Sequence, residues 1–119
     1  MTRDGWRSSF QEFARRLQGS DVYITVDLDC LEQGASVTNW EHGLFTLADV
    51  AWAIGEIRNH GAVVGGDICG AYSVPRYERR LQGFIAGRDH PPAPVVVPGE
   101  TARVNGIALA SLWPVLTAD

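Results

Sequence analysis

The stretch VYITVDLD, residues 22–29, decides the fold class of this chain. Its first five residues are β-branched or aromatic, which is typical of a buried β-strand. A second run, AVVGGDI at residues 62–68, has the same apolar and β-branched character. A segment with helical spacing separates the two runs, so the order strand, helix, strand predicts a right-handed βαβ unit with parallel strands. We therefore expect an α/β fold.

The segment between the strands has clear helix signals. Thr46 and Asp49 are spaced as a cap before a helix, and Gly61 is a stop signal. Its apolar residues recur at helical spacing and form one stripe, which consists of Leu47, Val50, Ala51, Ile54 and Ile57. The helix is therefore expected to cover one face of the parallel strands.

Asp27 and Asp29 close the first strand. Residues i and i+2 of a strand point to the same face, so both carboxylates are expected to point into one site. Like charges close together raise each other's pKa, and a cation removes that cost. The pair therefore predicts part of a divalent metal site. The alternative is that both carboxylates cap amides of the following loop.

Other segments fill in the rest of a single domain spanning 1–119. Ser9 and Glu12 predict a capping box for a first helix, which Gly19 ends. A last helix is expected from about Glu100, ended by Pro114. Its expected buried side is Val104, Ile107, Ala108, Leu112 and Val115. Between these, the sequence predicts an amphipathic stripe at Tyr77, Leu81, Phe84 and Ile85, a stiff connector at 90–94, and a possible short strand at 95–97.

Composition excludes several classes of function. The chain has 119 residues, of which 45% are hydrophobic and 20% charged, with a net charge of −4. Such a balance argues against a nucleic-acid surface, which needs clustered basic charge. No apolar run reaches the roughly 18 residues that a membrane span requires. With two cysteines and no apolar signal segment at the N-terminus, the expected location is the cytoplasm.

The motifs resemble the ureohydrolase family, which includes arginase, agmatinase and formimidoylglutamase. The family has a strand ending in Asp-x-Asp, a Gly-Leu-Thr-like turn, a helix and a second strand ending in Gly-x-Asp. Here these correspond to Asp27-Leu28-Asp29, Gly43-Leu44-Phe45-Thr46 and Gly65-Gly66-Asp67, within residues 6–75. The resemblance implies a three-layer arginase-like fold and a manganese pair held in part by Asp27 and Asp29. It also implies hydrolysis of a linear C–N bond in a small guanidino or amidino substrate.

The chain departs from the family pattern at several places. The family's upstream Gly-Gly-Asp-His and Asp-Ala-His-x-Asp motifs are absent, and His42, His60 and His90 lie in no such motif. Glu32-Gln33 stands where the family has Asp-Pro, and Gly70 stands where it has a substrate-binding Glu. We therefore expect only part of the metal site here, and negligible activity from this chain alone.

Seven further residues are weaker candidates for the site. Asp67 could support the metal ligands from a second layer, or accept hydrogen bonds from the next loop. Glu32 could orient a ligand or cap the loop, and His42 could shuttle a proton near the metal or be an exposed loop histidine. Cys30 and Cys69 could form a redox or soft-metal pair, or be two small buried residues. Two aromatic residues near the strand ends, Trp40 and Tyr72, could line a pocket or simply pack.

Two parallel strands make an incomplete sheet, because parallel strands are normally covered on both faces in larger sheets. The chain is therefore expected to be the C-terminal part of a larger ureohydrolase-like protein, a protein that completes its sheet as a homo-oligomer, or a partner of a separate N-terminal chain. The competing function is a non-catalytic binding or oligomerisation module of ureohydrolase-like fold.

Overall fold

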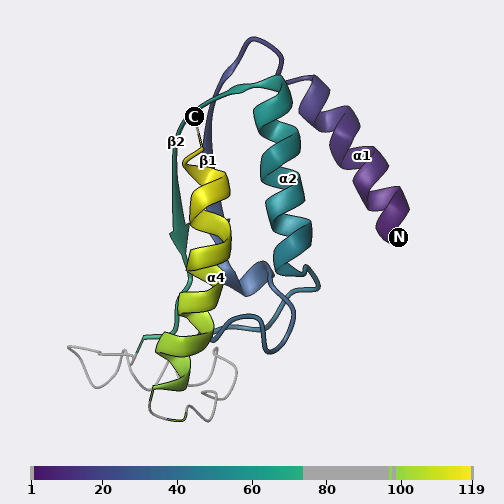
Figure 1. The fold of residues 1–119 in the computed structure, drawn as a ribbon. Coiled ribbons are helices and arrows are strands. Elements are labelled where there is room, and N and C mark those ends of the chain that lie inside the picture. Colours follow the sequence, from purple (N-terminus) through teal and green to yellow (C-terminus); the bar gives the residue numbers. More distant parts are fainter. Residues whose placement is uncertain (1, 74–96, 98, 119) are drawn as a thin grey trace, which may run out of the picture.

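The computed structural model describes residues 2–73, 97 and 99–118, and in them the chain forms three α-helices and a two-stranded parallel sheet (Figure 1). The elements in chain order are α1 (Arg3–Arg15), β1 (Asp21–Asp27), the short 3₁₀ turn η1 (Leu28–Cys30), α2 (Leu47–His60), β2 (Ala62–Cys69) and α4 (Glu100–Leu116). The predicted α/β class is confirmed. No helix in these ranges is long and apolar enough to cross a bilayer.

The two strands pair in parallel, as the strand–helix–strand order predicts. Their register runs from Asp21 opposite Ala62 to Asp27 opposite Cys69, with one irregularity between Val22 and Tyr23. Since the strands are parallel, their carboxyl ends lie at the same edge of the sheet. Asp27, Cys69 and the loops that follow them are therefore neighbours.

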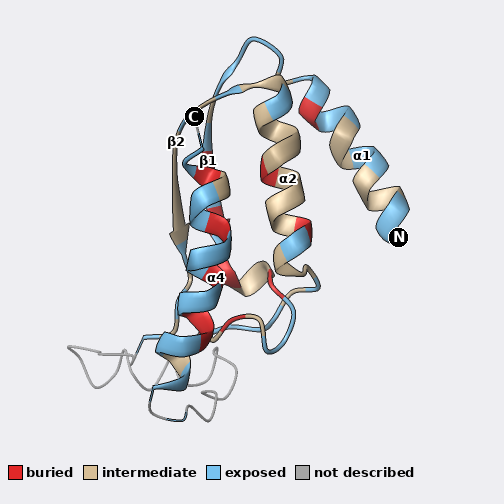
Figure 2. Cartoon of the chain, viewed as in Figure 1, coloured by how far each residue is buried: buried red, intermediate tan, exposed pale blue. Residues whose placement is uncertain are grey.

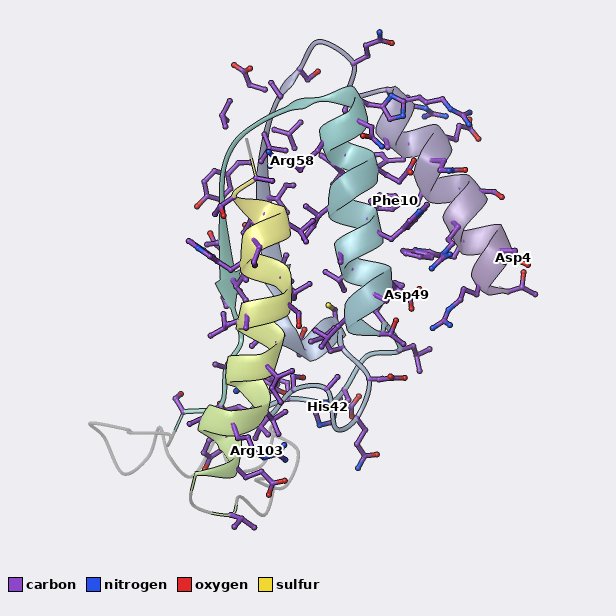
Figure 3. All side chains as sticks on the ribbon, in the orientation of Figure 1. Asp4, Phe10, His42, Asp49, Arg58 and Arg103 are labelled. Carbon is purple, nitrogen blue, oxygen red and sulfur yellow. The ribbon has the colours of Figure 1, made fainter. Side chains whose placement is uncertain are left out.

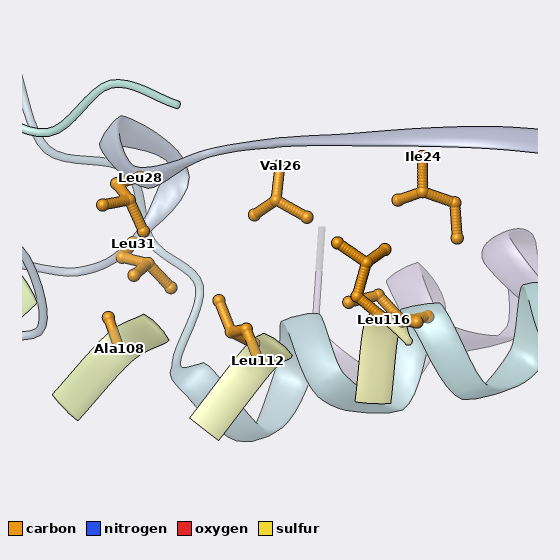
Figure 4. Close-up of a cluster of buried hydrophobic side chains, with 8 residues drawn as sticks. Ile24, Val26, Leu28, Leu31, Ala108, Leu112 and Leu116 are labelled. Atoms are coloured by element: carbon orange, nitrogen blue, oxygen red, sulfur yellow. The ribbon is translucent and has the colours of Figure 1, made fainter. Parts of the chain in front are cut away.

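One face of the sheet carries the core. Alternate residues of β1, Ile24 and Val26, are buried, whereas Tyr23 and Thr25 between them are exposed. The buried side chains point toward Leu112 and Leu116 of α4 (Figure 4). The full core cluster is Ile24, Val26, Leu28, Leu31, Ile54, Ala108, Leu112 and Leu116. Both α2 and α4 contribute to it, so they cover the same face of the sheet. The outward face of α4 is largely exposed, whereas most of α2 is half-buried (Figure 2).

Helix α1 packs on α2, on the side away from α4 (Figure 1). Its aromatic side chains stack against those around α2, with ring centroids 4.8 Å apart for Trp6 and Phe45 and 5.4 Å apart for Trp6 and Trp52. Phe10 points from α1 toward α2, and Asp49 lies near the start of α2 (Figure 3). The nearly buried Asp49 carboxylate accepts hydrogen bonds from Arg3 at 2.7 Å and from Arg7 at 3.1 Å. An aromatic cluster and an ionic cluster therefore hold α1 in place.

The caps of α2 agree with the sequence, but that of α1 does not. Thr46 and Asp49 form a reciprocal capping box, and Gly61 is the residue that ends α2. The prediction that Ser9 caps the first helix is wrong, because α1 begins at Arg3 and its N-cap is Thr2, whose Oγ1 accepts from the N–H of Gly5. Ser9 lies inside the helix, where its hydroxyl donates to Gly5 O. A serine in this position can satisfy its hydroxyl on the preceding turn, so the S-x-x-E pattern alone did not locate the start.

The last helix begins at Glu100 as expected, but two details differ. Pro114 does not end α4, which continues to Leu116, and Thr117 still donates to Trp113 O. Pro114 lies in the final turn of α4. A proline there removes only one backbone hydrogen bond of the helix and does not force the chain to leave the helical conformation. Ile107 is 52% exposed, whereas Asn105 and Leu116 join Val104, Ala108 and Leu112 on the buried side.

Some sequence predictions concern residues outside those described. These are the amphipathic stripe from Tyr77 to Ile85, the connector at 90–94 and the possible strand at 95–97. Within the described ranges β1 and β2 form the entire sheet.

Candidate functional site at the carboxyl ends of the strands

Asp27 is the last residue of β1 and also the N-cap of η1. Its carboxylate accepts a hydrogen bond from the N–H of Asp29 at 3.2 Å. Asp29 thus lies in a 3₁₀ turn and not in the strand, so the argument from alternating strand positions is wrong for this residue. The turn nevertheless keeps Asp29 near Asp27, and the Asp27 carboxylate caps a backbone amide of this turn, as the capping alternative predicts for Asp27.

The segment 43–45 fixes η1 through backbone hydrogen bonds. Gly43 donates its N–H to Asp29 O at 2.6 Å, and Phe45 donates to Cys30 O at 3.1 Å. A side chain at position 43 would collide with the backbone of Cys30, so only glycine allows this approach. The Gly-Leu-Phe-Thr turn therefore positions the carboxylate pair as well as opening α2.

The two carboxylates affect each other electrostatically. The pKa of Asp29 is raised, first by its partial burial, then by the negative charge of Asp27 and a hydrogen bond with that carboxyl group. This is the behaviour expected of like charges held close together without a compensating cation. The pair carries an electrostatic cost that bound cations would relieve.

Gly70, the residue that follows β2, lies against the same carboxylate pair. Its φ is +81°, in the left-handed region, and a Cβ at this position would collide with Asp27 Oδ1. A larger side chain there would displace the Asp27 carboxylate. A glutamate side chain at position 70 would therefore have no space in this structure.

Asp67 lies on the outer, uncovered face of the sheet. It is opposite Thr25 in the register, and its carboxylate accepts a hydrogen bond from the Tyr23 hydroxyl at 3.0 Å. That hydrogen bond, the negative charge of Asp67 and a small burial effect raise the pKa of Tyr23. The described partner of Asp67 is thus Tyr23, and its support of the metal ligands stays a prediction.

Both cysteines are free thiols near the carboxylates. Cys69 is exposed and opposite Asp27, and Cys30 is half-buried beside Asp29. The pKa of Cys30 is raised by burial and then by Asp29 and Asp27, and the pKa of Cys69 by burial and then by Asp27, Asp67 and Asp29. Because the thiolate is the reactive and metal-binding form, this environment disfavours redox or soft-metal chemistry.

The remaining candidates lie in the long loop. Glu32 and His42 are exposed, and Figure 3 shows His42 in the loop that precedes α2. Trp40 is 50% exposed, and Tyr72 donates its N–H to Val37 O at 2.8 Å. In the described ranges, no three or more His, Cys, Asp and Glu side chains gather in a way that could hold a metal ion. The structure therefore brings Asp27 and Asp29 together, with Asp67 and Cys69 nearby, but adds neither Glu32 nor His42 to such a group.

Asn105 is an important residue of this region that the sequence analysis missed. It is 5% exposed on α4, and its side-chain amide binds both the N–H and the C=O of Val37 in the loop. Ser36, next to Val37, donates to Leu28 O at 2.7 Å. The sequence does contain a signal for this role, since Asn105 is a polar amide within residues 104–118, a stretch without any charged residue.

A second feature not foreseen is an apolar groove of about 280 Å³ beside β1. It is lined by Ile24, Thr25, Val26 and Asp27 of β1, by Trp6 and Phe10 of α1, by Cys30 and Phe45, and by Asp49, Val50, Ala53, Ile54 and Ile57 of α2. The groove ends near the carboxylate pair, since both include Asp27.

Comparisons with known protein families, with curated proteins and with solved structures found no match to this chain.

Proposed function

We propose that this chain is the C-terminal part of a ureohydrolase-like enzyme, a manganese-dependent hydrolase of linear C–N bonds in small guanidino or amidino compounds. The observation that carries the proposal is the fixed Asp27–Asp29 pair at the carboxyl end of a parallel strand. The Gly43–Phe45 turn supports it, because in the sequence pattern of the family this turn follows the same pair. The finer arginase-like, three-layer architecture belongs to this proposal.

The residues present fit one part of a manganese site. Two carboxylates are suitable hard ligands, and Mn²⁺ prefers oxygen donors. Further ligands would have to come from another segment or another chain, as in a homo-oligomer or a complex with an N-terminal half. When bound, manganese would supply an activated water for hydrolysis. Asp27 and Asp29 would hold and orient the cation, while a carboxylate for the substrate's guanidinium would have to lie elsewhere than position 70.

A calorimetric titration of the purified chain with Mn²⁺ tests the proposal. We expect binding that Asp27→Asn abolishes, because the amide lacks the charge but still accepts the hydrogen bond from Asp29. Asp21→Asn is the matched control, since Asp21 is an exposed aspartate at the other end of the same strand. Equal binding by all three proteins, or binding by none even at millimolar Mn²⁺, would count against a metal role for Asp27.

The competing function is a non-catalytic module that has kept the fold for binding or assembly. The observation in its favour is Gly70, whose left-handed conformation and contact with Asp27 leave no room for the family's glutamate. This alternative predicts that Asp27→Asn changes neither assembly nor stability, with or without Mn²⁺. Stabilisation by Mn²⁺ that depends on Asp27, seen as a raised melting temperature, would contradict it.

A further inference from the structure

The apolar groove runs along the edge of β1 that faces away from β2, termed the free edge because no described residue pairs with it. Four consecutive residues of β1, from Ile24 to Asp27, line it. Because successive strand side chains point to opposite faces, a groove against one face would touch only alternate residues. Contact with all four places the groove beside the strand, where β1 has no described neighbour.

The backbone of β1 is oriented to bond at that edge. Ser20 O accepts from the N–H of Ala62 at 2.9 Å, so residue 20 directs its carbonyl toward β2. Backbone polar groups of alternate residues point to opposite edges of a strand. Beyond the irregularity between Val22 and Tyr23, Ile24 O lies close to Gly66 of β2, so the same alternation continues there. The backbone polar groups of Val22, Ile24 and Val26 therefore face β2. Tyr23 and Thr25 direct their N–H and C=O groups to the free edge.

The walls define what kind of segment fits. On the core side, the groove is closed by Trp6 and Phe10 from α1 and by Ala53 and Ile57 from α2. The opposite side is the outer face of the sheet, which no described helix covers, with Tyr23 60% exposed. An occupant therefore needs a backbone in extended conformation, with apolar side chains at every second position and polar ones between them.

The charge along β1 shows whether a strand of another protein or a second copy of β1 is the better partner. Asp21 and Asp27 occupy the two ends of β1, and Asp29 and Asp67 lie close to its carboxyl end. An antiparallel pair of β1 strands centred on Ile24 would place Asp21 opposite Asp27 twice, and like charges directly opposite are destabilising. The Asp49 carboxylate on the α2 wall is already paired with Arg3 and Arg7. Among the described residues, the remaining charge along the edge is negative and favours a basic partner.

We propose that the free edge of β1 binds an extended strand of another polypeptide, with apolar residues at alternate positions and basic residues between them. The partner strand hydrogen-bonds to Tyr23 and Thr25, places its apolar residues beneath α1 and α2, and extends the sheet beyond two strands. This inference does not depend on a metal at Asp27 and Asp29.

Amide hydrogen exchange of the full ¹⁵N-labelled chain provides the test, with a capped peptide of alternating lysine and valine as the probe. We expect the peptide to slow exchange at Tyr23 and Thr25 by about tenfold or more, while Val22 and Ile24 change little because they already face β2. Two peptides serve as comparisons. The first alternates glutamate with valine, and the second has the same lysines and valines but groups them in two separate blocks. Both are expected to protect Thr25 at least about tenfold less at equal concentration.

Two variants test whether the peptide binds in the groove or elsewhere on the molecule. Ala53→Phe fills the groove from α2 and should abolish protection by the peptide. Ala48→Phe adds the same ring on an exposed position of α2 that does not line the groove, and should leave protection unchanged. Circular dichroism of both variants verifies the fold.

Four results would overturn the proposal. They are protection of Thr25 before peptide is added, equal protection by all three peptides, undiminished protection in Ala53→Phe, and dimers of the chain alone that protect Thr25. The first would mean that another part of this chain already occupies the edge, and the last that a second copy is the partner.

Discussion

Asn105 of α4 holds both backbone polar groups of Val37, accepting from its N–H at 2.8 Å and donating to its carbonyl at 2.9 Å. The two residues are 68 positions apart, so this one amide fixes the loop that follows β1 to the last helix. The Val37 carbonyl also accepts from Tyr72, which follows β2. Val37 is thus tied to α4 and to the segment after β2, and Ser36 beside it to Leu28 O at the end of β1.

Asn105→Ala should therefore destabilise the protein by about 2 kcal/mol, because it removes two hydrogen bonds and leaves the Val37 N–H without its partner in a part-buried position. Urea unfolding measures the loss. Asn39→Ala is the matched control, since Asn39 makes the same two bonds to exposed Ser73 and should cost less than about 1 kcal/mol. Equal losses in the two variants would show that burial at Asn105 is unimportant.

Asp49 should make stability depend on pH in the acid range. Burial acts to raise its pKa, but hydrogen bonds from Thr46 and Arg7 and the charge of Arg3 outweigh burial, so the pKa lies below its ordinary value of 3.8. A pKa lowered by folding gives stability that is present above the unfolded value and lost as pH falls through the folded one. Asp49→Asn should cost about 2 kcal/mol at pH 7, and this difference from wild type should shrink below about pH 4.

Unfolding in urea at a series of pH values checks this prediction. Glu12→Gln removes the exposed i,i+4 pair with Arg16 and should change stability by less than about 0.5 kcal/mol at pH 7. A pH-independent cost of Asp49→Asn would show that capping geometry matters and the charge does not.

Gly70→Ala should be costly for two separable reasons. The left-handed backbone alone costs about 1 kcal/mol, which Gly34→Ala measures, because Gly34 has a φ of +91° and open space around it. At position 70 the new Cβ would also displace the Asp27 carboxylate, adding about 1–2 kcal/mol. In an Asp27→Ala background most of this extra cost should vanish, leaving only the close approach to the Leu28 N–H, and a double-mutant cycle measures it. An unchanged cost in that background would argue that Asp27 is not the obstacle.

Gly66→Ala tests how closely α4 packs on the sheet. A Cβ at Gly66 would lie 2.7 Å from both Ile24 O and Leu116 Cδ1, so we expect a loss of about 1–3 kcal/mol. Gly55→Ala, on α2 with nothing within 4 Å, should instead stabilise the protein by about 0.5–1 kcal/mol. Thermal unfolding of the two variants should give shifts of opposite sign, and a shift of the same sign would contradict the packing at Gly66.

The parts of the fold that could be predicted rest on local signals. The Thr46–Asp49 box, the Gly61 stop and the parallel pairing follow from spacing alone. The start of α1 did not, because both Thr2 and Ser9 carry a hydroxyl and only tertiary packing of Trp6 on Phe45 favours the earlier one. Likewise, Ile107 belongs to an almost uniformly apolar stretch, in which periodicity cannot select the buried side.

The site was foreseen in part. The sequence placed Asp27 and Asp29 together, but for a reason that assumed a longer strand. Asn105 could not be paired with Val37, since nothing in the sequence reveals a contact across 68 positions. The groove beside β1 is also a product of how α1 and α2 sit on the sheet.

The attachment of α1 has a consequence for access to the groove. α1 is held by its aromatic and ionic clusters against α2 and the segment before it, and it contributes no residue to the buried core cluster. It is therefore the one wall that can detach while the sheet, α2 and α4 remain assembled. If α1 detached, Trp6 and Phe10 would leave the edge of β1 and open it to solvent. The equilibrium between attached and detached α1 would therefore control how fast a strand can reach this edge.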